Sequence, residues 1–338
     1  MDRKELRAWL AVLGEPAFRG DQVFEGLHRH RFASWNQFTS LSTALRAKLE
    51  SAAQLQWPEI TESIDSEDGS TKHVFRLSDG RQVEGVHMPL AKRRTLCLSS
   101  QVGCAMGCTF CATGLMGIVR NLSAGEIVGQ VVAMLTAHHH SGDEPVNLVF
   151  MGMGEPLHNL ENVMKAFRIL TDAGGLGLSP RRITVSTSGL ASGIERMAAY
   201  AKRPRLALSL NATTDEYRSR IMPVNRAWNL AALAEVLARF PLEKRERITL
   251  EYVLLSGVTD SLEDGRRLAR FAQGFPSKIN LIPFNPHEGS GFEPPSEERI
   301  GQLCQILSKA GLTVSVRRSR GQDVAGACGQ LIRKRGDS

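Results

Sequence analysis

The chain has 338 residues, of which 42% are hydrophobic and 23% charged, as in an ordinary soluble globular protein. No apolar run approaches the length of a membrane span and no signal peptide opens the sequence, which excludes a membrane protein and favours a cytoplasmic location. The six cysteines therefore do not indicate a disulfide framework. An excess of Lys and Arg (42) over Asp and Glu (35) gives a net charge of +7, which favours a polyanionic partner such as nucleic acid.

The first 50 or so residues are expected to form helices, because apolar residues recur at helical spacing over 5–13, 21–30 and 42–52. We interpret residues 1–55 as a helical N-terminal domain that binds the substrate or caps the main domain. Residues 56–92 are expected to form a β-hairpin extension, with strand-like runs at 71–77 and 82–88 around a turn at 78–81.

From about residue 93, strand-like and helix-like stretches alternate. Such alternation predicts a parallel sheet with right-handed crossovers. The expected fold class is therefore α/β, a partial (βα)6 barrel over 93–338 with functional residues at the carboxyl ends of its strands. The clearest helix starts with a capping box of Ser123 and Glu126. The expected strands are 94–98, 147–151, 183–186, 206–210, 248–254, 278–282 and 313–316, and the expected helices are 123–138, 159–173, 229–240, 261–273 and 296–310.

Three cysteines follow the first of these strands with the spacing C-x3-C-x2-C: Cys104, Cys108 and Cys111. Gly103 and Gly107 let the backbone wrap closely, as a loop must if several thiolates face one centre. Thiolates bind zinc or iron–sulfur clusters, and a structural zinc site would need a fourth ligand that no nearby Cys or His supplies. We therefore expect a [4Fe–4S] cluster with one open iron, able to chelate S-adenosylmethionine (SAM). Simple burial of three small side chains is the weaker alternative.

The cysteine loop resembles the signature of the radical-SAM superfamily, with Phe110 as the aromatic residue before the last cysteine. Other segments are similar to those of the dual-specificity ribosomal and transfer RNA adenine-C2 methyltransferases, and the resemblance runs nearly from end to end. It implies a radical-SAM barrel with an RNA-binding helical domain at 1–55. The segments that carry the resemblance are 18–22, 150–156, 186–189, 209–212, 282–286 and 320–331.

The resemblance also implies which residues contact SAM. Glu155 would accept hydrogen bonds from the ammonium group of SAM, and Gly154 would let the backbone approach it closely. The ribose and the carboxylate of SAM would meet residues at equivalent strand ends. These expected contacts are Ser186, Ser209, Leu210, Asn211 and Asn285.

Two isolated cysteines acquire roles only through the resemblance. Adenine carbon 2 is electron-poor and cannot attack a methyl sulfonium, so Cys328 is expected to take a methyl group from SAM as covalent nucleophile. Cys97 would then form a disulfide with Cys328 and release the methylated base. Glu84 occupies the position of the proton acceptor. Cys304, on an expected helix, is assigned to packing.

The expected partners are ribosomal RNA, transfer RNA and an electron donor such as flavodoxin, and we expect a monomer without membrane contact. RNA contacts are expected from the N-terminal helices and the basic segment 317–320. Further basic clusters, at 92–94, 181–182 and 333–335, are each interpreted as solvated surface. The run His138-His139-His140 is interpreted as a solvent-facing helix end.

Two alternatives remain open at this stage. An enzyme of the same fold could methylate carbon 8 of the same adenosine, which would confer antibiotic resistance. An RNA-binding protein with a structural zinc site would explain the charge and the cysteine loop, but not Glu155, Cys97 and Cys328 together.

Overall fold

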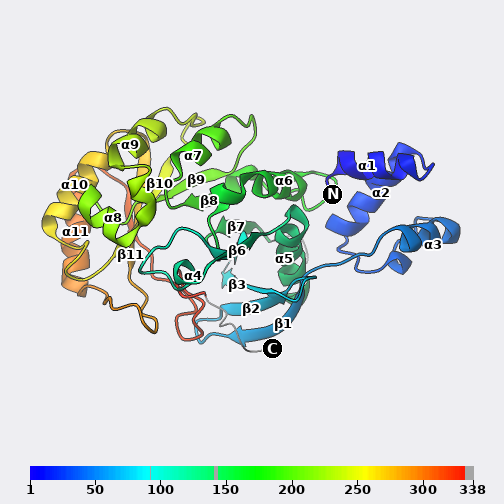
Figure 1. Cartoon of the computed structure of the whole chain (residues 1–338), viewed down its shortest axis with the longest axis horizontal. Helices are drawn as coiled ribbons and strands as arrows, with labels where there is room; N and C mark the ends of the chain where they lie inside the picture. Colours follow the sequence, from blue (N-terminus) through cyan, green and yellow to red (C-terminus); the bar gives the residue numbers. More distant parts are fainter. Residues whose placement is uncertain (92, 141–143, 332–338) are drawn as a thin grey trace.

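The computed structural model describes residues 1–91, 93–140 and 144–331 (Figure 1). Lys92 and the basic cluster at 333–335 lie outside the described residues. At one end of the molecule, three helices form the small N-terminal domain: α1 (Arg3–Val12), α2 (Ala17–His28) and α3 (Thr43–Ala52). Asp2 and Glu5 form a capping box at the start of α1.

Within the described residues, ten strands form one sheet in the order β1-β2-β3-β4-β7-β8-β9-β10-β11-β12. The first four are antiparallel, and from β4 onward neighbours run parallel. The antiparallel extension is β1 (Glu59–Asp65), β2 (Thr71–Arg76) and β3 (Gln82–Leu90). The parallel strands are β4 (Arg93–Cys97), β7 (Val146–Phe150), β8 (Ile183–Thr187), β9 (Arg205–Ser209), β10 (Ile248–Leu254), β11 (Ser277–Pro283) and β12 (Val314–Val316).

The parallel strands follow one another in chain order, so each crossover joins neighbours and the sheet curls into an open barrel. This confirms the predicted α/β partial barrel. The capping box of Ser123 and Glu126 starts the first crossover helix as expected. The crossover helices are α5 (Ala124–Ala137), α6 (Leu160–Thr171), α7 (Ala191–Ala198), α8 (Asp215–Ile221), α9 (Leu230–Ala238), α10 (Leu262–Ala272) and α11 (Glu297–Lys309).

Sequence analysis did not anticipate α7, α8 or β1. The two helices have eight and seven residues, too few for a clear helical period. Strand β1 lies at the edge of the sheet and has no fully buried residue, so it lacks the apolar alternation of an inner strand. No described helix is long and apolar enough to cross a membrane.

The histidine run at the end of α5 does not face solvent as a whole, which corrects the sequence interpretation. The His138 ring stacks on His87 with 3.6 Å between centroids, and its Nε2 lies 2.8 Å from Nε2 of His73. His140 is buried as well. The antiparallel extension packs beside the end of α5, a contact that helix periodicity alone does not indicate.

After β12 the chain crosses back to the antiparallel extension. Arg320 donates from Nη1 to the Pro89 carbonyl (2.6 Å), and the Gly321 amide donates to Asp68 Oδ2 (2.8 Å). Ser66 Oγ donates to Asp323 Oδ1 (2.6 Å). These bonds span the open side of the barrel and place the following loop, which carries Cys328, against the cysteine loop.

Candidate active site

The cysteine loop starts at the end of a short ribbon formed by β5 (Gln101–Cys104) and β6 (Gly117–Asn121). Gly103 has a φ of 75°, and a Cβ there would overlap the Gly117 carbonyl oxygen, so only glycine fits. Cys108 lies in the loop and Cys111 directly precedes α4 (Ala112–Leu115).

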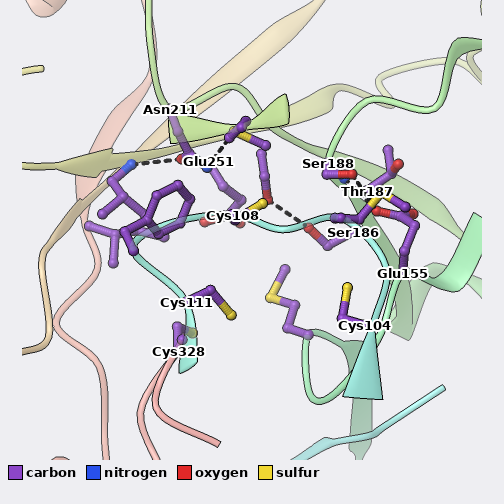
Figure 2. A pocket seen from close by; sticks show the side chains of 18 of the residues that line it. Cys104, Cys108, Cys111, Glu155, Ser186, Thr187, Ser188, Asn211, Glu251 and Cys328 are labelled. Carbon is purple, nitrogen blue, oxygen red and sulfur yellow. Dashed lines mark hydrogen bonds between the residues drawn. The ribbon is translucent and has the colours of Figure 1, made fainter. Parts of the chain in front are cut away.

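All three thiols line one cavity, which we call the cluster cavity (Figure 2). Burial raises the pKa of Cys104 to about 12 and also raises the pKa of Cys108 and Cys111. Such thiols hold their protons until a metal displaces them. Among the described residues, no three Cys, His, Asp or Glu side chains converge closely enough to bind a single ion.

Glu155 forms part of the cavity wall on the side of Cys104, away from Cys111 and Cys328 (Figure 2). Its Oε2 accepts hydrogen bonds from the amide and the hydroxyl of Ser188 (2.7 and 2.8 Å), and its Oε1 accepts from the Leu157 amide (3.1 Å). Burial outweighs these bonds and raises the pKa of the carboxyl group. No cation of the described chain lies within 4.0 Å, so a ligand ammonium group would supply the missing positive charge.

The backbone beside Glu155 needs glycine. Gly154 has a φ of 99°, and a Cβ there would lie 2.5 Å from Cβ of Gln101. The same Gln101 holds the Glu155 amide through its Oε1 (2.8 Å). Gly154 itself lines the cluster cavity, so the predicted close approach of its backbone to SAM stays a prediction beside this contact with Gln101.

Further predicted SAM contacts line the cluster cavity at the ends of adjacent strands. Ser186 is the last residue but one of β8 and Ser209 ends β9, with their hydroxyl oxygens 3.3 Å apart. Asn211 follows with a φ of 59°, and its Oδ1 accepts from the Val253 amide (2.9 Å). Carboxyl ends of parallel neighbours share one edge, which brings these side chains together.

Leu210 is placed differently from the other predicted contacts. Its side chain is fully buried in the main core and does not line the cavity. Its carbonyl accepts from Nε of Arg218 (2.9 Å), and the same guanidinium donates from Nη2 to the Ser188 carbonyl (2.6 Å). The Leu210 carbonyl also accepts from the Ala212 amide (2.8 Å), and its own amide donates to the Glu251 carbonyl (2.9 Å), so the backbone of Leu210 is held within the protein.

Asn285 lines the cluster cavity and also holds the Cys328 loop. Its Nδ2 donates to Oγ of Ser319 (2.9 Å) and to the Cys328 carbonyl (3.1 Å), while its Oδ1 accepts from Gln322 (2.9 Å). The first residue of α4 contacts the same segment, because the Ala112 amide donates to the Gly329 carbonyl (2.7 Å). Figure 2 shows Cys111 and Cys328 on the same side of the cavity.

Cys97 and Cys328 line a second cavity along the inner face of the barrel, which we call the thiol cavity. Cys328 belongs to both cavities, as do Met151, Glu251 and Arg317. Burial, together with the neighbouring Cys328, raises the pKa of Cys97 to about 12. Both thiols are free in this structure.

Glu84 lines neither cavity. It lies on β3 two residues before Val86, which does line the thiol cavity, so both side chains point to the same face of the strand. The buried carboxylate lies 3.5 Å from Nζ of Lys72.

The sequence matches two family models: residues 98–271 match the radical SAM superfamily, and residues 1–55 match the ribosomal RNA large subunit methyltransferase N-terminal domain. A dual-specificity RNA methyltransferase RlmN of Geobacter sulfurreducens is 49% identical over 330 residues, covering 97% of this chain and 89% of the relative. RlmN 2 of Myxococcus xanthus is 48% identical, covering 95% of this chain and 86% of the relative. The crystal structure of a radical SAM methyltransferase from Sphaerobacter thermophilus superposes with a TM-score of 0.93 at 42% identity, covering 98% of this chain and 97% of that one.

The chain belongs to the RlmN family of radical-SAM methyltransferases. The family resemblance inferred from the sequence is thereby confirmed, and the alternative of a non-enzymatic zinc protein finds no support. Like other members of its family, this RlmN-family enzyme uses SAM and a [4Fe–4S] cluster. The residues present fit both groups: three thiols of the cluster cavity suit the irons, and the uncompensated carboxylate of Glu155 suits the SAM ammonium.

Two residues between the cavities were missed in the sequence. Glu251 is a buried carboxylate with a raised pKa, caused by burial, and it lies 3.7 Å from Nη1 of Arg317. One signal for Glu251 existed, because it is the only charge within the otherwise apolar or uncharged run Ile248–Leu254. In the sequence, Arg317 belongs to the basic segment 317–320 that is expected to contact RNA, and only the fold turns its side chain inward.

Proposed function

We propose that this RlmN-family enzyme methylates carbon 2 of an adenosine in large-subunit ribosomal RNA and in transfer RNA through an S-methylcysteine intermediate. The observation that carries the proposal is the position of Cys328 on the wall shared by the two cavities. From there its sulfur can meet SAM on one side and a nucleobase beside Cys97 on the other.

Cys328 is the methyl carrier in this scheme. Its sulfur attacks the methyl group of SAM, the bond between the SAM sulfur and the methyl carbon breaks, and S-adenosylhomocysteine leaves. When bound, the cluster supplies the electron for reductive cleavage of a second SAM, which provides the radical that removes hydrogen from the S-methyl group. Asn285 and the Ala112 amide hold the Cys328 segment in place for both events.

Cys97 and Glu84 complete the reaction. The methylene radical on the Cys328 sulfur adds to carbon 2 of the base, and Glu84, held beside Lys72, accepts the carbon-2 proton. Loss of the remaining unpaired electron, which the cluster would take back when bound, leaves a closed-shell thioether between Cys328 and the base. The Cys97 thiolate then attacks the Cys328 sulfur. A disulfide forms as the bond between that sulfur and the methylene carbon breaks, and the carbon takes up a proton to become the methyl group. An external reductant reopens the disulfide for the next cycle.

The protein is proposed to work as a cytoplasmic monomer that receives electrons from a donor such as flavodoxin. Ribosomal RNA as substrate is supported by the match of residues 1–55 to a ribosomal RNA large subunit methyltransferase N-terminal domain. The two RNA classes are supported by the dual-specificity naming of the relatives.

The deciding experiment is mass spectrometry of nucleosides after anaerobic incubation of the cluster-reconstituted protein with SAM, a reductant and protein-free large-subunit ribosomal RNA. We expect 2-methyladenosine from the wild type and none from Cys328→Ala. Cys97→Ala should accumulate a covalent protein–RNA adduct through Cys328, and Cys304→Ala should behave like the wild type. Formation of 8-methyladenosine would move the protein to the carbon-8 alternative.

A further inference from the structure

The thiol cavity opens at the amino ends of the parallel strands, away from the cysteine loop. Arg93 begins β4, Arg205 begins β9, Arg182 directly precedes β8, and Lys278 is the second residue of β11. Of the residues that line this cavity, eight are Arg or Lys and one, Glu251, is acidic. The mouth of the cavity is therefore strongly cationic.

Most of the charge at this mouth is not neutralised by the protein. None of Arg93, Arg182, Arg205 and Lys278 lies within 4.0 Å of a carboxylate of the described chain. Among the described residues, the Arg182 guanidinium donates a single side-chain hydrogen bond, from Nη1 to Oδ1 of Asn147 (3.3 Å). Positive side chains that lie together without carboxylate partners repel one another. The phosphates of a nucleic acid would neutralise them, and the counter-ions condensed on the nucleic acid would be released into solution.

The cationic surface continues toward the N-terminal domain. Arg182 also lines a groove between that domain and the barrel, together with Arg29 and Arg31. Arg31 donates from Nη2 to the His140 carbonyl (3.0 Å), while its enclosed Nη1 has no hydrogen-bond partner among the described residues. The groove and the mouth thus meet at Arg182, which lines both.

We propose that Arg31, Arg182, Arg205 and Arg93 form a track for the RNA backbone, and that the target adenosine enters the thiol cavity through the mouth at the amino ends of the strands. This inference rests on the proposed function and adds the route by which the substrate arrives. A base inside a helix or stacked loop has to leave its stack to reach an enclosed thiol, and its flanking phosphates then remain outside. The track lies where those phosphates would remain.

The two reactants thereby approach the methyl carrier from opposite ends of the barrel. SAM occupies the cluster cavity at the carboxyl ends of the strands, and the base reaches Cys328 from the amino ends. The shared wall of Met151, Glu251, Arg317 and Cys328 separates them. RNA can then bind and leave without displacing the cofactor.

The track is tested by RNA affinity measured against salt. The cluster-reconstituted double variant Arg182→Gln/Arg205→Gln is compared with the wild type on a protein-free transcript of large-subunit ribosomal RNA. A lost phosphate contact lowers the slope of log K against log salt by about 1, so the double variant should lose about 2. The matched control is Arg226→Gln/Lys309→Gln, which removes two exposed cations without ion pairs from elsewhere on the barrel and should keep the wild-type slope.

The direction of approach is tested by crosslinking from a 4-thiouridine placed next to the target adenosine. Crosslinks to peptides that contain residues 181–184 or 205–207 are expected. Crosslinks confined to residues 285–292, beside the cluster cavity, would overturn the route.

The two proposals fail in different ways. Wild-type salt slopes in Arg182→Gln/Arg205→Gln would overturn the track even if 2-methyladenosine forms normally. Conversely, a wild type that binds RNA through these arginines but makes no 2-methyladenosine would overturn the proposed function and leave the track standing. Cluster absorbance and SAM affinity, measured on every variant, show that the fold and the cofactor site are intact.

Discussion

Asn285 makes three hydrogen bonds that hold the Cys328 segment, to Ser319, Gln322 and the Cys328 carbonyl. Asn285→Ala removes all three. A buried hydrogen bond contributes about 1 kcal/mol net, and water can partly replace the bonds to the more exposed Ser319 and Gln322. The ordered loop should therefore lose about 2 kcal/mol of stability. Since about 1.4 kcal/mol corresponds to a factor of ten, methyl transfer to Cys328 should slow about 30-fold.

The assay follows S-methylation of Cys328 by peptide mass spectrometry, with SAM affinity measured separately by equilibrium dialysis. Ser319→Ala removes only one of the three bonds and serves as a graded control, with an expected effect of about fivefold. A role in holding the loop predicts slower transfer with nearly unchanged SAM affinity. An Asn285→Ala protein whose SAM affinity falls as much as its transfer rate would refute this reasoning and restore Asn285 as a direct SAM contact.

The remaining predictions concern the resolving thiol, the cavity wall and the buried arginine. The Cys97 thiolate is the attacking form and burial raises the pKa of Cys97 to about 12, so release of methylated RNA from Cys328 should accelerate about tenfold per pH unit between pH 7 and 9. Single-turnover quenching of the adduct measures this rate, and a flat profile would contradict the role. Gly154→Ala should weaken SAM binding, measured by equilibrium dialysis, at least about tenfold because the new Cβ would collide with Gln101. Gly125→Ala is the control and should leave the SAM affinity unchanged, because the nearest atom to its Cβ would be 3.8 Å away. Arg218→Met should lower the free energy of unfolding by about 3 kcal/mol in urea titrations, because the Ser188 carbonyl and the side-chain oxygen of Asn225 lose the donor that Arg218 supplies; an unchanged midpoint would show that water replaces the guanidinium.

Much of the barrel could be predicted because its strands are buried on both faces and therefore stand out as short apolar runs between amphipathic helices. Strand β10 starts and ends at the predicted residues. Where burial is one-sided or an element is short, as in β1 and α8, the pattern was too weak to detect.

The candidate site also contains residues that local sequence patterns could group and residues that they could not. Cys104, Cys108 and Cys111 are close in the chain, so their spacing alone indicated a shared centre. Glu155, Ser186 and Ser209 could be grouped because adjacent parallel strands present their carboxyl ends at one edge. The resemblance, not any local pattern, assigned Cys97 and Cys328 to one reaction.

Sequence by itself thus determined the fold class and predicted that the three cysteines share one centre, because periodicity and close spacing are local properties of a chain. Only the tertiary structure decided what depends on segments meeting from far apart. It turned Arg317 inward toward Glu251 while Arg318 pairs with Glu297 outside, because consecutive side chains of extended chain point to opposite sides. It also gathered single arginines from separate strand starts into one cationic mouth, an arrangement that no stretch of sequence contains.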